Sequence, residues 1–172
     1  MATRSPTPPL LMTAASLVLA VWPWSAGAFD ATKFEDFKTT NICKYCDLTD
    51  APMSGLDMRG ADFQNANLSG AKLSKANLGE RPMEKRTLVT NFEDANLRRA
   101  DFTGANLHLA NFSNAYLREA NLSGADLSDS VLTKANLKGA VLKGANLKGA
   151  QTEGAVFCNT VMPDGAVNDS GC

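Results

Sequence analysis

The sequence has few residues of the kinds that most catalytic sites use. His108 is the single histidine among 172 residues, which excludes a multi-histidine metal site and argues against a buried histidine base. Neither of the usual glycine-rich phosphate-binding patterns occurs. One CxxC motif is present, at residues 43–46, but Asp47 stands where a c-type haem motif needs histidine. We therefore expect no enzyme, no catalytic residue, no cofactor and no metal.

The sequence also lacks a long hydrophobic run and a strong excess of charge. The longest apolar stretch, residues 10–24, is interrupted by Pro23 and is short for a membrane span. The small residues 26–28 (AGA) follow it, which predicts a signal peptide over 1–28 and a mature chain that starts at Phe29. Removal of the signal peptide takes away one of the 17 basic residues. The mature chain then has 16 basic and 18 acidic residues and a net charge of −2. The mature chain is then one small domain without a membrane span.

One five-residue phrase, in contrast, dominates the chain from Thr90 to Phe157. Of its fourteen copies, thirteen have Leu or Phe at the centre and twelve have Ala two residues earlier. A period of five fits neither a helix nor an alternating strand. Ala and Leu/Phe are two residues apart, so in an extended triplet their side chains point to the same side. The last two positions of each copy are mostly polar residues or glycine, which suit a corner. The repeat predicts a solenoid filled with these apolar residues, its coils paired about 4.8 Å apart.

This repeat resembles the pattern A-(N/D)-(L/F)-x-x of the pentapeptide-repeat family. The resemblance covers about two thirds of the chain. It implies an all-β fold, a right-handed quadrilateral parallel β-helix with four copies per coil. It implies little about activity, because most members of the family have no assigned function.

Residues 29–40 precede the repeats and have no five-residue register. We expect an N-terminal capping segment there, with a short helix that Asp30 caps and that places Phe34 and Phe37 on one face. An open end of a solenoid exposes its core and unpaired strand edges, so a cap is needed.

The pentapeptide-repeat solenoid is expected to occupy residues 41–172, with one interruption. Eight looser copies end at Leu78, and Phe92 comes fourteen residues later, one short of three repeats. Residues 79–89 are therefore predicted to form a loop insertion or a short helix. Loops on rigid scaffolds often carry function.

The four cysteines of an exported small domain predict two disulfides. Cys43 and Cys46 are three residues apart across a bend, within disulfide reach. Cys158 and Cys172 bracket the tail, and their bond would close a C-terminal cap over residues 158–172, worth about 3 kcal/mol by loop entropy. In the alternative interpretation Cys43 and Cys46 form a redox or metal motif.

Residues twenty apart stack on one face if each coil holds four copies. This stacking predicts a basic column on the solenoid and places Arg99 above Glu119, a pair that offsets part of the repulsion. Residues 66–118 contain more basic than acidic residues, and this stretch includes the predicted loop. The possible partner-binding residues are Lys85, Arg86, Arg98, Arg118 and Lys138.

The leading hypothesis is a non-enzymatic exported solenoid that acts as a scaffold or protein-binding surface in the periplasm or a thylakoid lumen. The resemblance particularly favours the lumen, and no nucleic-acid partner is expected. One alternative is a DNA-mimicking protein that binds type II topoisomerases, as some family members do, but this needs a cytoplasmic location and a strongly acidic face. The other is a thiol-redox-responsive lumenal protein that uses Cys43 and Cys46.

Overall fold

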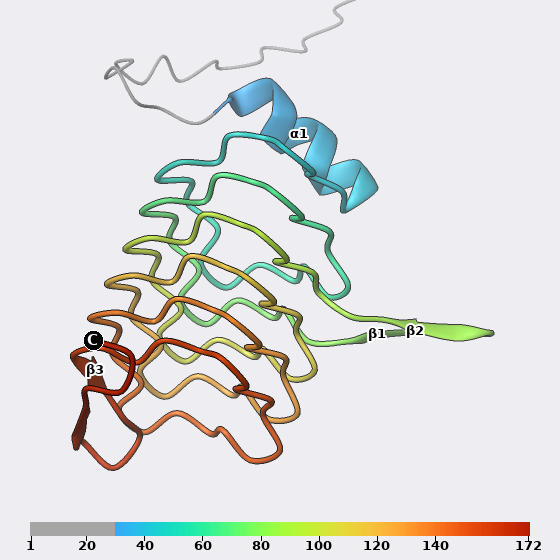
Figure 1. Ribbon diagram of the computed structural model, residues 1–172. Coiled ribbons are helices and arrows are strands. Elements are labelled where there is room, and N and C mark those ends of the chain that lie inside the picture. The colour runs from blue at the N-terminus through green and yellow to red at the C-terminus, as the bar shows by residue number, and fades with distance from the viewer. Residues whose placement is uncertain (1–29) are drawn as a thin grey trace, which may run out of the picture.

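The computed structural model describes residues 30–172, which wind into a stack of coils (Figure 1). The predicted signal peptide and the cleavage site before Phe29 lie outside these residues. Among residues 30–172, no helix has both the length and the apolar character needed to cross a membrane.

Four ladders of parallel bridges hold the coils together. One ladder joins Asn91, Asn111, Val131 and Gln151, each twenty residues after the last. Three further ladders follow the same spacing, so each coil has four sides and contains four repeats, as predicted. Between the second and the third coil, paired residues are 29 positions apart in the sequence instead of twenty, as in the pair of Asp62 and Asn91.

The interior of the coils is filled by the central residues and the alanines of the repeats. Leu122 and Ala120 are fully buried, like nearly all residues at their positions. Phenylalanines on one side stack through successive coils, with ring centroids 5.1 Å apart from Phe63 to Phe92 and 4.9 Å apart from Phe92 to Phe112. The polar substitutes for alanine are buried too, and each bonds to a backbone carbonyl; they are Thr90, Ser130 and Thr160.

The backbone hydrogen bonds explain why asparagine or aspartate follows alanine in the repeat. In the copy around Leu122, the amides of Asn121, Leu122 and Gly124 bond to neighbouring coils. The amide of Ser123, at the first corner position, has no backbone acceptor and donates instead to Asn121 Oδ1 at 3.1 Å. In copies such as this one, the Asn or Asp side chain thus satisfies the corner amide that has no backbone acceptor.

Helix α1 (Ala31–Thr40) lies over the first coil (Figure 1). Asp30 is its N-cap, accepting from the amides of Thr32 and Lys33. Phe37 is buried, with its ring 4.9 Å from that of Phe63. The helix therefore covers the apolar end of the solenoid.

Residues inserted after the second coil form a β-hairpin rather than a loop or short helix. Strands β1 (Arg81–Met83) and β2 (Arg86–Leu88) pair antiparallel and project from the side of the coils (Figure 1). Pro82 is paired with Thr87, and this is the middle one of the three residue pairs of the hairpin. In a two-residue hairpin this pair exchanges no ladder hydrogen bonds, so proline fits the strand without loss.

The C-terminal end carries a second small hairpin, of β3 (Thr160–Val161) and β4 (Val167–Asn168). Val161 still bridges to Val141, so the coil continues to this point. Val167, although in five-residue phase, is 59% exposed and does not enter the core. The repeat therefore ends before Val167, and the tail turns back antiparallel.

Candidate functional site

The basic column consists of Arg98, Arg118 and Lys138, which occupy the same corner of three successive coils. Corner residues are linked by backbone hydrogen bonds from coil to coil. The amide of Arg99 donates to Arg118 O at 2.9 Å, and that of Glu119 donates to Lys138 O at 3.0 Å. The ladders therefore hold the backbones of the three residues about 4.8 Å apart along the axis.

None of the three side chains of the column forms an ion pair with another residue in 30–172. Arg98 and Lys138 are exposed, whereas Arg118 is half-buried between them. Arg118 Nε is buried and has no hydrogen-bond partner within the described part of the chain. A buried donor without a partner costs stability, so packing alone does not account for an arginine here.

Arg99 and Glu119 form an ion pair beside the column, as the stacking predicted. Arg99 Nε donates to Glu119 Oε2 at 2.8 Å. This hydrogen bond holds the pKa of Glu119 below its ordinary value, and the charges of Arg118 and Arg98 add to the effect. The carboxylate is thus engaged by Arg99, and the column keeps its positive charge.

Tyr116 is an exposed aromatic residue next to the column that the sequence interpretation overlooked. It bridges to Asn96 above and Asn136 below, and 53% of it is exposed. It occupies the Asn/Asp position, so it supplies no acceptor for the corner amide of Arg118, which has none among the described residues. The signal was the departure AYLRE from the repeat, at a position where a polar side chain has a defined structural task.

The hairpin β1–β2, with Lys85 and Arg86, lies at the corner diagonally opposite the column. It leaves the coil after Glu80, at the corner of Gly60, whose amide donates to Gly79 O at 3.1 Å. The column instead continues the corner of Gly70, whose amide donates to Arg98 O at 2.8 Å. Two sides of the coil separate these positions in either direction, so the structure does not bring the five predicted residues into one surface.

Both disulfides expected from the spacing are present. Cys43 is bonded to Cys46 and Cys158 to Cys172, with Cα–Cα distances of 5.5 and 4.7 Å, and the described residues contain no free cysteine. Cys43 is buried at a central position and Cys46 half-buried at an alanine position. Both sulfurs of the CxxC motif therefore replace core side chains.

Other potential sites offer little chemistry. The ring of His108 lies at a corner, with Nδ1 2.9 Å from Ser128 Oγ. The part of the chain from residue 30 onward contains no group of three His, Cys, Asp or Glu side chains able to hold a metal ion. His108 therefore suits a structural role at a corner, as the cysteines do in the core.

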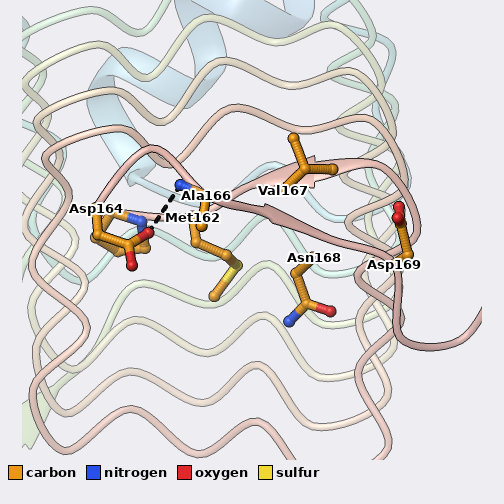
Figure 2. Close-up of a pocket in the computed structure, with 7 residues that line it drawn as sticks. Met162, Asp164, Ala166, Val167, Asn168 and Asp169 are labelled. Atoms are coloured by element: carbon orange, nitrogen blue, oxygen red, sulfur yellow. Dashed lines mark hydrogen bonds between the residues drawn. The ribbon is translucent and has the colours of Figure 1, made fainter.

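A shallow hollow at the C-terminal end is formed by the tail (Figure 2). The Asp164 carboxylate, at its edge, accepts from the Ala166 amide at 2.9 Å. The wall contains no histidine, lysine, arginine or hydroxyl side chain to pair with its carboxylates. It is lined by Met162, Pro163, Asp164, Ala166, Val167, Asn168 and Asp169.

Four-sided coils of five-residue repeats, with Asn or Asp side chains bonded to the amides of most corners, define a pentapeptide-repeat β-helix. The family model for pentapeptide repeats matches in eight copies, over residues 42–79, 90–114 and 110–149, which is more than half of the chain. The chain belongs to the pentapeptide-repeat family, whose members fold as right-handed quadrilateral β-helices and are generally non-enzymatic.

Solved structures of the family include similar proteins. Rfr23 from the cyanobacterium Cyanothece 51142 superimposes with a TM-score of 0.66 at 23% identity, over 73% of this chain and 92% of that chain. AT2G44920 from the Arabidopsis thaliana thylakoid lumen has 28% identity and a TM-score of 0.39, over 68% and 72%. QnrB1, a plasmid-mediated fluoroquinolone resistance protein, has 19% identity and a TM-score of 0.30, over 66% and 72%. No curated protein sequence matched the chain.

Proposed function

We propose that this chain is an exported, non-enzymatic scaffold that binds a partner protein through the basic column. The observation that carries the proposal is the stack of three cations that form no ion pair with described residues, in which Arg118 Nε is buried and unpartnered. Groups that weaken the isolated protein are commonly retained where they serve binding. A rigid β-helix suits this role, because binding a partner then requires little reordering of the site.

Export is part of the proposal and is supported by the sequence and the cysteines. Residues 1–28 have the composition of a signal peptide, and both disulfides belong to an oxidising compartment. The periplasm and the thylakoid lumen both satisfy this condition.

The two alternative functions are less well supported by the charge and the cysteines. A DNA mimic needs an acidic face, whereas the corner described here is basic. A redox role for Cys43 and Cys46 needs accessible sulfur, whereas Cys43 is only 4% exposed and fills a core position.

The test is capture of partners from an extract of the exported compartment on immobilised protein. Reversal of charge in R98E/R118E is expected to abolish capture of the partner in low salt while the melting temperature stays nearly unchanged. The control K143E/K148E makes the same change of charge at two other corners and is expected to leave capture intact. Equal capture by wild type and R98E/R118E would reject the proposal.

A further inference from the structure

The basic column is a narrow strip. The side of the solenoid that ends at Arg98 begins at Asp94, and Glu119 lies beside Arg118 on the corner itself. The unneutralised charge is therefore one residue wide and three coils long. A broad anionic plane, such as a membrane, would also meet Asp94 and Glu119. A linear chain of anions along the solenoid axis would follow the three cations, pass Glu119, which Arg99 engages, and avoid Asp94.

Arg118 and Tyr116 give this strip the composition of a protein-binding site. Tyr116 lies on the side of the coil next to the column and is more than half exposed, and its side chain forms no hydrogen bond or ring contact with described residues. Tyrosine and arginine are the residue types enriched at the energetic centres of protein interfaces. Guanidinium groups bind carboxylates in a directed, often bidentate way.

We propose that the basic column and Tyr116 bind an extended, Asp/Glu-rich segment of the partner protein, running along the solenoid axis. This inference rests on the proposed function and specifies its ligand. Carboxylates of the segment lie between Arg98, Arg118 and Lys138 and relieve their mutual repulsion. The segment also covers Tyr116, which supplies contact area with few rotatable bonds.

The inference predicts that binding and stability oppose one another at Arg118. R118M removes the central charge of the stack and places a methyl group where the buried, unpartnered Nε lies. The variant is expected to bind the acidic segment less tightly, yet to melt at the same or a higher temperature in low salt. A residue that only maintained the coil would lower the melting temperature when replaced.

The experiment measures fluorescence anisotropy of a labelled polyglutamate peptide with the purified protein, against a polyglutamine peptide of equal length. R98Q/R118Q is expected to weaken polyglutamate binding by about tenfold or more, with a salt-dependent loss. The control K143Q/K148Q removes equal charge from exposed lysines at other corners and should change binding by less than about twofold. Y116A should weaken binding, whereas Y45A, at the 75% exposed Tyr45, should not.

Each other outcome is decisive. Equal losses in the two double variants would reject the column as a site. Column-dependent binding to vesicles of equal parts phosphatidylcholine and phosphatidylglycerol, without polyglutamate binding, would replace the peptide by a lipid surface. If polyglutamate fails but capture from the exported extract still depends on Arg98 and Arg118, this inference alone fails. If that capture is independent of the column, the proposed function fails as well.

Discussion

Arg99 donates a hydrogen bond of 2.8 Å from Nε to the carboxylate of Glu119 on the next coil. Glu119 is the one carboxylate within the basic corner, and it lowers the local positive potential. E119Q is therefore expected to increase the affinity for polyglutamate in low salt and to leave the fold intact, because exposed ion pairs contribute little to stability. Anisotropy titrations test this. E153Q, at an exposed carboxylate on another corner, should have no effect; an equal gain there would indicate only net charge.

Leu122 is fully buried in the fourth coil. Its truncation in L122A leaves a cavity that the rigid neighbouring coils fill poorly, and we expect a loss of about 2–5 kcal/mol in the free energy of unfolding. Denaturant unfolding followed by far-UV circular dichroism measures it. The wild-type spectrum should be dominated by β-structure. K143A, at an exposed corner, should cost little, and a loss in L122A no larger than in K143A would contradict the packed solenoid.

Thr90 closes the base of the hairpin insertion. Its hydroxyl lies 3.2 Å from Gly79 O and accepts from the Gly60 amide at 3.1 Å, and the side chain is fully buried. T90V has nearly the same shape but removes the hydroxyl, so that the Gly60 amide and Gly79 O keep only the bond to each other, at a cost of about 0.5–1.5 kcal/mol. T90S keeps the hydroxyl and should be less destabilised in the same unfolding experiment. If the two variants are equally stable, the hydroxyl has no such role.

The coil could be predicted from the sequence because its determinants are local and repeated. Leu122, Ala120 and Asn121 occupy positions whose roles recur in most copies, so one pattern specifies core, corner and ladder together. The helix that begins after Asp30 was predictable for a similar reason, because a capping side chain acts on the two or three residues that follow it.

The interruption at residues 79–89 was harder to interpret, because it has no repeat to define it. Pro82 near the start of the segment suits the first turn of a helix and also a non-hydrogen-bonded strand position. The hairpin follows from pairing between Arg81 and Leu88, which local propensity does not specify.

The candidate site was predicted only in part. Stacking of Arg98 on Arg118 follows from the twenty-residue coil, and so does the pair of Arg99 with Glu119. The separation of the column from Lys85 requires the order of the corners around a coil, which charge counts along the sequence do not contain. Tyr116 was overlooked because the task of the Asn/Asp side chain becomes evident only from the hydrogen bonds.

Cys158 and Cys172 close the tail over the last coil. Opening this loop in C158S/C172S is expected to cost about 3 kcal/mol in the free energy of unfolding, since the bond restricts the unfolded chain. The bond between Cys43 and Cys46 closes a much shorter loop, so C43S/C46S should cost less. Non-reducing peptide mapping of the native protein should find these two pairs. A bond between the first pair and the second would contradict the assignment.

Asp126 makes stability depend on pH in a predictable direction. Its carboxylate accepts from Ser128 Oγ at 2.7 Å, from the Ser128 amide at 3.0 Å and from Asn146 Nδ2 at 2.9 Å. The Ser128 hydroxyl is the largest cause that lowers the pKa of Asp126 in the folded state, and burial only partly opposes it. The folded pKa is thus below the unfolded one. Asp126 therefore stabilises the fold above the ordinary aspartate pKa of about 3.9, and this contribution is lost as the pH falls through the folded pKa.

D126N should remove this contribution while keeping the coil, because Asn121 makes the equivalent bonds with Ser123 at 2.6 and 3.1 Å. Near neutral pH the variant is expected to be slightly less stable than wild type, since it loses charge-assisted hydrogen bonds. As the pH falls from about 4 through the folded pKa of Asp126, the two unfolding curves should converge, because the wild-type carboxylate becomes protonated over this range. Urea unfolding over this range measures the difference. A gap between D126N and wild type that stays constant or widens on acidification would show that Asp126 is not ionised in these bonds.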